Sequence, residues 1–238
     1  LWQASRTPLA NAGRQGSVAA MTELSDLQTP CLLLDEARML RNIARIRDRL
    51  AGTGVRYRAH LKTAKSVEVA RLQMETPAGP AMVSTLREAE VFADAGVTDM
   101  TYGVGISPDK LERVRALRRR GVDIAVILDN VAQAEAVAAA STPDLPLAAL
   151  IEIDCDGHRS GVKPDDAALM TAIAAALAPR AELRGVLTHG GESYVAKGKA
   201  ALEAAAEGER LAVVDAAAIL RAAGHACPVV SAGSTPTF

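Results

Sequence analysis

The sequence predicts an α/β fold built on a parallel sheet, with an α/β barrel favoured over an open sheet. Short apolar segments recur roughly every 25 to 30 residues, and a stretch with helical periodicity follows each, the pattern of β/α units. Eight such segments favour a TIM-like (β/α)8 barrel, and an open doubly wound sheet is the alternative. No GxGxxG motif follows the first segment, which weighs against a dinucleotide-binding sheet.

Composition narrows the class of protein further. Apolar residues make up 49% of the chain and aromatic residues 3%, so the core must be aliphatic and rich in alanine. A net charge of −1 argues against nucleic acid or an anionic membrane as a partner. Three scattered cysteines fit a reducing compartment better than a disulfide framework, so we expect a cytoplasmic protein.

The first residues differ in composition from the rest. Residues 1–20 contain Arg6 and Arg14 but no acid, and they lack the apolar segment of a secretory signal. We therefore expect residues 1–26 to be a poorly ordered extension rather than a targeting peptide, with Met21 as a plausible start. Residues 27–238 form the expected barrel domain.

The first predicted elements are a strand over 30–35 and a helix over 36–50. Apolar residues of this helix form a stripe expected to face a core, and Gly52 and Gly54 end it. A strand that begins at 55–57 and a helix over 67–73 follow. Later strands are expected at 81–84, 99–102, 124–128, 147–154, 183–188 and 229–231, and helices at 87–95, 107–120, 130–140, 164–177 and 199–223, with another starting after Gly233.

Lys62 lies where the predicted strand from residue 55 ends, on the barrel face that carries the chemistry of such enzymes. An amine that forms an imine must be neutral part of the time, so its pKa would have to fall from about 10.4 to near 7, at a cost of roughly 4 kcal/mol. Burial beside another cation can lower it, and His60, Lys65 and Arg58 are candidate neighbours. The alternative is a surface lysine in a loop.

Three polar segments also follow predicted strands, over residues 154–161, 189–194 and 233–237. In the last, which we name the phosphate loop, a glycine, two hydroxyls and Pro236 before a helix suit a phosphate group, although an ordinary helix cap would look similar. Asp154, Cys155, Asp156 and His158 are too crowded for a usual metal-ligand spacing, so we assign no metal ligand. Together with Lys62, these segments describe a pyridoxal-phosphate pocket.

These motifs together resemble the D-serine dehydratase and D-threonine aldolase family of pyridoxal-phosphate enzymes, which has a barrel of the alanine racemase N-terminal type. The resemblance covers residues 27–238, with a leaning to the dehydratase branch. The residues that carry it are Thr29-Pro30, Arg58 to Lys65, Arg87 to Glu90, Asp154 to Gly161, His189 to Tyr194 and Gly233 to Thr237.

The resemblance implies a role for several residues. Lys62 would hold the cofactor as an imine and act as a base at the substrate α-carbon. Arg159, His189 and Tyr194 would contact the cofactor, and Gly233, Ser234 and Thr235 would hold its phosphate. The implied reaction is the elimination of water from a D-3-hydroxy amino acid, giving a 2-oxo acid and ammonia. Retro-aldol cleavage to glycine and an aldehyde is the alternative, as is a non-catalytic pyridoxal-phosphate-binding barrel.

The resemblance also implies more chain after Phe238. The rest would supply the last barrel strand and a β-rich domain that carries a divalent metal, zinc or similar, and it would help to form a homodimer. We therefore expect an incomplete barrel of seven strands, with the strand over 31–34 left without a sheet of its own. We also expect residues 1–238 alone to bind the cofactor weakly and to turn over slowly.

Overall fold

The computed structural model describes residues 23–178 and 180–238. Residues 1–22, which make up most of the predicted extension, lie outside the described residues. The described chain falls into two compact units, one ending at Gly54 and one running from Val55 to Phe238.

The described residues of the first unit contain a 3-10 turn, η1 (Leu24–Asp26), and one helix, α1 (Glu36–Leu50). The side chain of Asp35 caps α1 by accepting a hydrogen bond from the Arg38 N–H at 2.8 Å. The prediction that the whole apolar stripe faces a core is wrong: Ile43 is buried, but Leu40 is exposed. Among the described residues of this unit, no second layer of secondary structure covers that face of the helix.

The prediction that residues 31–34 form a strand is also wrong. In the described residues this segment forms no ladder, and Leu32, Leu33 and Leu34 are exposed. A strand requires a neighbour to pair with its backbone, and none is present here. The expectation that this segment has no sheet of its own is confirmed.

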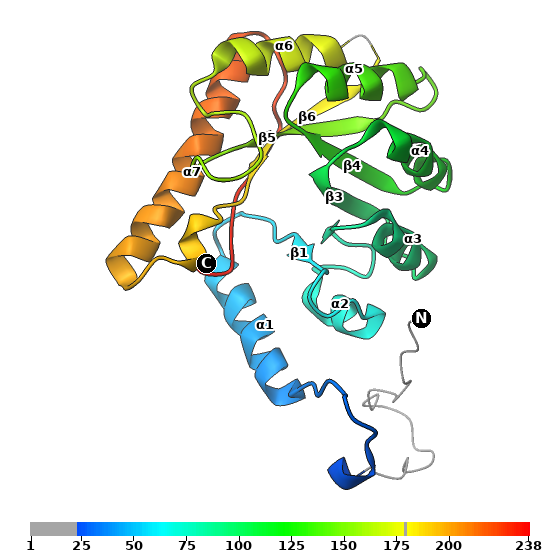
Figure 1. Cartoon of the computed structure of the whole chain (residues 1–238), viewed down its shortest axis with the longest axis vertical. Coiled ribbons are helices and arrows are strands. Elements are labelled where there is room, and N and C mark those ends of the chain that lie inside the picture. The colour runs from blue at the N-terminus through cyan, green and yellow to red at the C-terminus, as the bar shows by residue number, and fades with distance from the viewer. Residues whose placement is uncertain (1–22, 179) are drawn as a thin grey trace. The chain divides into compact units, whose positions relative to one another are not determined.

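The second unit is a curled parallel sheet with helices on its outer side (Figure 1). Within the described residues the sheet has seven strands in the order of the sequence, as predicted. These are β1 (Ala59–His60), β2 (Ala81–Val83), β3 (Asp99–Gly105), β4 (Asp123–Leu128), β5 (Ala148–Ile153), β6 (Glu182–Thr188) and β7 (Val229–Ser231).

The helices of this unit connect successive strands, as in a β/α barrel. They are α2 (Val67–Gln73), α3 (Leu86–Asp94), α4 (Leu111–Arg119), α5 (Val131–Ala140), α6 (Ala167–Leu177) and α7 (Lys199–Ala222), with 3-10 turns η2 (Pro108–Lys110) and η3 (Glu192–Tyr194). Among the described residues, no helix is both long and apolar enough to cross a bilayer.

Two predicted helix starts are wrong. Pro108 opens the 3-10 turn η2, and α4 begins only at Leu111. Helix α6 begins at Ala167 because Asp166 caps it, with its side chain accepting from the Leu169 N–H at 3.0 Å. Residues 235–237 form a turn, and the helix expected after them stays a prediction.

Alternate strand residues separate two apolar layers. The larger layer lies between the sheet and the helices, and a smaller one lines the inner side of the curled sheet. The inner layer consists of Ala125, Ile127, Ala148, Leu150 and Leu187, with Met82 against it. Because strand side chains alternate with a period of two, the next inward positions toward the strand ends are Ser84, Asp129, Glu152 and His189. This layer therefore fixes which side chains face the barrel mouth.

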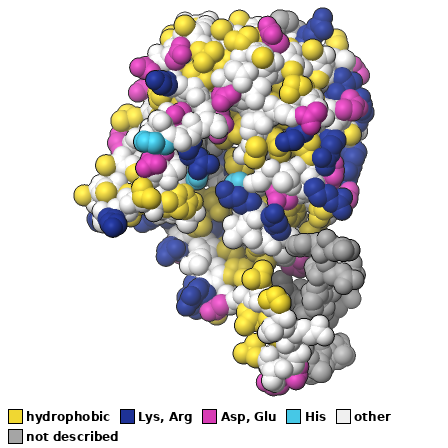
Figure 2. All heavy atoms as spheres, viewed as in Figure 1, with side chains coloured by type: hydrophobic (Ala, Val, Ile, Leu, Met, Phe, Trp, Pro, Cys, Tyr) yellow, Lys and Arg dark blue, Asp and Glu magenta, His cyan; other side chains and the backbone are white. Residues whose placement is uncertain are grey.

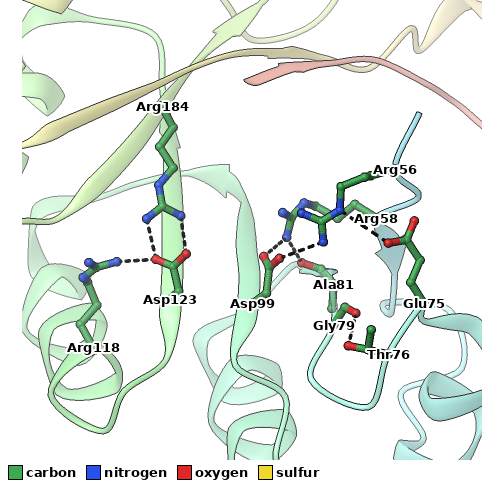
Figure 3. Close-up of polar contacts among 10 residues, drawn as sticks. All are labelled: Arg56, Arg58, Glu75, Thr76, Gly79, Ala81, Asp99, Arg118, Asp123 and Arg184. Carbon is green, nitrogen blue, oxygen red and sulfur yellow. Dashed lines mark hydrogen bonds and ion pairs between the residues drawn. The ribbon is translucent and has the colours of Figure 1, made fainter. Parts of the chain in front are cut away.

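The strand starts form the opposite end of the barrel, where charged side chains line a cavity of about 360 Å³ (Figure 3). Arg58 donates to Asp99 at 2.7 Å and to the Ala81 carbonyl at 3.2 Å. Arg184 and Arg118 both donate to Asp123, which pairs with Asp99 in the ladder. Burial alone would raise the pKa of Asp123, but hydrogen bonds and charges from the two arginines lower it below its ordinary value.

This arrangement corrects one prediction about Lys62. Arg58 reaches the starts of β2 and β3, whereas Lys62 follows the end of β1, so Arg58 is not its cationic neighbour.

Candidate active site at the strand ends

Lys62 lies in the turn directly after β1. Leu61, the residue before it, is buried, and its N–H donates to the Met82 carbonyl at 2.9 Å. The Lys62 N–H points to His60 Nδ1 at 3.4 Å. The backbone is therefore held against β2 while the Lys62 side chain remains exposed at the barrel mouth.

His60 lies next to Lys62 and interacts electrostatically with Lys62, Glu88 and His189. Burial first, and then the nearby charges of Lys62 and His189, lower the pKa of His60 from 6.5 to about 4, although the charge of Glu88 opposes this shift. Its Nε2 lies 3.4 Å from the Ser84 hydroxyl. His60 is therefore a neutral imidazole near pH 7.

Lys65, the remaining predicted neighbour, is held by an acid. Its Nζ lies 3.1 Å from Oε1 of Glu88, which is buried and whose other oxygen accepts from the Ser84 N–H at 2.7 Å. Among the described residues, Lys65 is the non-glycine with a positive φ, at 50°. The Glu88 carboxylate therefore neutralises Lys65 and draws the end of the Lys62 turn toward α3.

The loops after β5 and β6 are bound to each other. The Glu192 N–H donates to Asp156 Oδ2 at 2.9 Å. A Cβ on Gly191 would lie 2.5 Å from Cδ of Arg159, so the arginine stem rests on this glycine. The structure thus brings Arg159 to the loop that carries His189 and Tyr194. The rings of these two residues are 6.0 Å apart in an edge-on arrangement.

The phosphate loop meets the same group of residues. His189 Nδ1 lies 3.2 Å from the Gly233 carbonyl, which joins the ends of β6 and β7. Ser234 is buried, while Thr235 is exposed. In Figure 2, histidine side chains and several Lys or Arg side chains lie near one another on the visible face of the molecule. All seven residues predicted for the site thus lie at the strand ends of one unit.

The sequence analysis missed two acids that lie in this region, Glu152 and Glu209. Glu152 is the ladder partner of Leu187 and continues the inward positions Ala148 and Leu150 on β5. The sequence did contain a signal for Glu152, because it follows Ala148 and Leu150 at a spacing of two residues and so shares their face of the strand. Glu209 lies in the alanine-rich helix α7 and is 4% exposed. No periodic pattern distinguishes it from an acid on a solvated helix face.

The pKa of Glu152 is raised from its ordinary 4.5 to about 7, first by burial and then by the charge of Asp129. In the unfolded chain this carboxyl ionises near 4.5, so its contribution to stability is complete below that pH and is lost as the pH rises through 7. The full shift corresponds to roughly 3.4 kcal/mol, but the side chain is partly exposed, and screening reduces the expected loss to about 1 to 2 kcal/mol.

Glu152→Gln removes this loss, because an amide does not ionise. We expect the free energy of unfolding to rise by about 1 to 2 kcal/mol at pH 8 and the gain to shrink toward pH 5. Urea denaturation of the wild type and variant at both pH values measures this. Glu135→Gln, on the exposed face of α5, is the matched control. An equal gain at both pH values would show that Glu152 does not titrate as described.

The donor set of this site suits an organic ligand rather than a metal ion. Among the described residues, no group of three or more histidine, cysteine, aspartate or glutamate side chains could hold a metal. A primary amine, a neutral imidazole, a guanidinium and the exposed Thr235 hydroxyl of the phosphate loop lie in this region instead. These groups suit a ligand that carries both a carbonyl and a phosphate.

Comparison with known proteins places this geometry in context. The family model of the alanine racemase N-terminal domain matches residues 34–238. Over 216 residues, 90% of this chain, the sequence is 50% identical to a D-threo-3-hydroxyaspartate dehydratase of Delftia sp., of which it covers 57%. The crystal structure of that enzyme superimposes with a TM-score of 0.85, over 89% of this chain and 56% of that one.

Two further relatives carry related names. A 3-hydroxy-D-aspartate aldolase of Paracoccus denitrificans is 35% identical over 90% of this chain and 56% of its own length. A D-serine dehydratase of Dictyostelium discoideum is 25% identical over 90% of this chain and 58% of its own length. The chain thus spans about half the length of these curated relatives.

Proposed function

This chain belongs to the alanine racemase N-terminal domain family, and we propose that it forms the cofactor-binding barrel of a pyridoxal-phosphate-dependent lyase acting on D-3-hydroxy amino acids. One observation carries the proposal: Lys62, Arg159, His189 and the phosphate loop converge at one end of a single curled sheet. The relatives named as dehydratases and aldolases of such amino acids support it.

The residues present fit pyridoxal phosphate. The exposed amine of Lys62 would hold its aldehyde carbon covalently, and Gly233, Ser234 and Thr235 would hold its phosphate. Arg159, His189 and Tyr194 would line the ring. When bound, this cofactor withdraws electrons and so stabilises negative charge at the substrate α-carbon. The other contributions to the reaction come from the chain itself.

The Lys62 amine is the group placed to accept the proton that the substrate loses at its α-carbon. His60 is neutral near pH 7, so it is not the cationic neighbour that the sequence analysis expected beside this amine. Loss of the β-hydroxyl together with a proton releases water and leaves an enamine. Tautomerisation and hydrolysis of the enamine then give a 2-oxo acid and ammonia.

We propose D-3-hydroxyaspartate as the first substrate to test, ahead of D-serine, because the Delftia relative named for that substrate is 50% identical. Elimination of water from it would give oxaloacetate and ammonia. The full-length protein, incubated with pyridoxal phosphate and each D-amino acid, is expected to release ammonia and the 2-oxo acid in equal amounts. Ammonia release from neither substrate would contradict the proposal.

Retro-aldol cleavage is the second candidate reaction, and the 35% identity to a 3-hydroxy-D-aspartate aldolase favours it. The bond between Cα and Cβ would break, and the β-hydroxyl would become a carbonyl. The products from D-3-hydroxyaspartate would be glycine and glyoxylate, without ammonia. The same incubation, analysed for glycine and for ammonia, therefore decides between the two reactions. Binding of the cofactor with no product at all would favour the non-catalytic barrel.

The proposal also includes a divalent metal, a homodimer and a cytoplasmic location. The resemblance of the motifs to dehydratases and aldolases supports the metal and the dimer, and the three free cysteines support a reducing compartment. We expect a chelator to slow the reaction of the full-length protein without releasing the covalently bound cofactor. If the reaction rate were unchanged after complete removal of metal, the proposed role of a divalent metal would be contradicted.

A further inference from the structure

We propose that Glu209 is a positioning residue whose carboxylate fixes the phosphate loop to the glycine turn that follows β6. The inference rests on the proposed function, since that function gives the phosphate loop its ligand. Glu209 lies in α7, 4% exposed. It touches neither the amine of Lys62 nor the exposed Thr235 in any described hydrogen bond, so it would act through the backbone that it holds.

Each carboxylate oxygen of Glu209 accepts from one of two separate segments. The Gly190 N–H donates to Oε1 at 2.5 Å. The Thr237 hydroxyl donates to Oε2, also at 2.5 Å. Hydrogen bonds to an ionised carboxylate are about twice as strong as neutral ones, so this side chain joins the two loops firmly.

Gly190 gives a second sign that the turn is built around this carboxylate. A Cβ at that position would lie 2.7 Å from Oε1 and 2.8 Å from Cγ of Glu209. Real Cβ atoms do not come so close, so a side chain at residue 190 would displace either the turn or the Glu209 carboxylate from this contact. The His189-Gly190 backbone therefore has its position because glycine and Glu209 occur together.

A chain of hydroxyls extends from Glu209 beneath the phosphate loop. The Ser234 hydroxyl lies 2.9 Å from that of Thr237 and 2.7 Å from that of Ser193. An ionised carboxylate only accepts, so the Thr237 proton points to Glu209 and the Ser234 hydroxyl can donate to Thr237. Ser234 is thus engaged toward the helix side of the loop.

In this arrangement, different residues of the phosphate loop anchor the loop and contact the ligand. The exposed Thr235 hydroxyl enters none of the hydrogen bonds among the described residues and is available to a ligand. Ser234 and Thr237 anchor the loop to Glu209, and Thr235 with the loop backbone remains to contact phosphate. In this proposal Ser234 helps to hold the phosphate by anchoring the loop through its buried hydroxyl.

The cost of burying Glu209 argues that it serves the site rather than the helix. Among the described residues, no lysine, arginine or histidine forms an ion pair with it, and a buried carboxylate without a cation costs stability. Its helical neighbours on the buried face are Ala212, Val213 and Ala216. An acid that breaks this apolar pattern is expected where function requires it.

The test compares Glu209→Gln with Glu207→Gln in the full-length protein. Glu207 is exposed on the same helix and pairs with Arg210 instead. The probes are pyridoxal phosphate and pyridoxal, which lacks the phosphate, titrated by absorbance. An amide has one acceptor oxygen for two donors. We therefore expect Glu209→Gln to weaken the affinity for pyridoxal phosphate about tenfold and the affinity for pyridoxal by less than about twofold. Glu207→Gln is expected to change neither.

A second pair of variants covers the case in which Glu209→Gln does not fold. Thr237→Val removes the hydroxyl that donates to Glu209, and Thr237→Ser keeps it. We expect the valine variant to lose affinity for pyridoxal phosphate selectively and the serine variant to recover most of it. The inference would be overturned if a variant lost the same affinity for pyridoxal as for pyridoxal phosphate. It would also be overturned if Glu209→Gln and Glu207→Gln, or Thr237→Val and Thr237→Ser, bound pyridoxal phosphate equally well.

Inorganic phosphate separates this inference from the proposed function. Phosphate is expected to raise the melting temperature of the wild type, and the rise should be smaller in Glu209→Gln. If the wild type showed this phosphate effect but no binding of pyridoxal phosphate that depends on Lys62, the proposed function would fail and the inference would stand. A wild type that binds neither would overturn both.

Discussion

Replacing Lys62 by alanine is expected to abolish covalent attachment of pyridoxal phosphate and to lower the rate of the lyase reaction by at least about a thousandfold. The exposed amine at the end of β1 is both the proposed attachment point and the proposed base, so its loss removes two functions at once. The measurement is the visible absorbance of protein with added cofactor, before and after reduction with borohydride. A band fixed by borohydride in the wild type alone is the expected result.

Lys62→Arg is the matched control, because it keeps the positive charge at residue 62 and changes the chemistry. A guanidinium remains protonated and cannot form an imine, so we expect Lys62→Arg to lose the fixed band as completely as Lys62→Ala. Lys163→Ala, an exposed lysine outside the strand-end groups described above, should behave as the wild type. A band of normal strength in Lys62→Ala would show that another amine holds the cofactor.

Gly185→Ala is expected to cause the largest loss of stability among single substitutions considered for this fold. Gly185 lies in β6 with a φ of 145°, and a Cβ there would lie 1.9 Å from the Val229 carbonyl oxygen of β7. The backbones of the two strands would have to separate. Overpacking and backbone strain together predict a loss of at least about 3 kcal/mol, or about 6 to 12 °C in melting temperature.

Gly208→Ala provides the comparison. Gly208 lies in α7 without a positive φ, and its Cβ would meet no heavy atom within 4 Å among the described residues. Alanine there should stabilise the helix by about 0.5 to 1 kcal/mol. Thermal unfolding of the two variants measures both effects. Because β7 leads into the phosphate loop, Gly185→Ala should also weaken binding of phosphate. Similar melting temperatures for the two variants would contradict the close approach of β6 and β7.

The sequence was sufficient to identify the fold because its regularities are local. Apolar segments followed by capped helices recur along the chain, and each cap residue and helix-ending glycine acts on its nearest neighbours. The expected seven strands are present, and Lys62, His189 and Gly233 all follow strands as the pattern required. Because the strands of a parallel sheet all end at the same edge, residues that follow these strands lie together at that edge.

The errors arose where a local pattern depends on a distant partner. The leucines over 31–34 suit a strand, but no neighbour pairs with them among the described residues. Arg58 is near Lys62 in the sequence, yet it reaches toward the strand starts, where Asp99 attracts it. Sequence proximity says nothing about which end of a barrel a long side chain selects.

The sequence by itself determined the order of strands and helices and the end of the sheet at which Lys62 and the other predicted site residues lie. Only the tertiary structure decided which acids join that site. The alternation within β5 places Glu152 on the inward face, but its position beside Leu187 depends on register. Glu209 reaches Gly190 and Thr237 from a helix that resembles a solvated one in sequence. Contacts between segments far apart in the chain depend on register and packing, and one sequence read alone does not encode these in any local pattern.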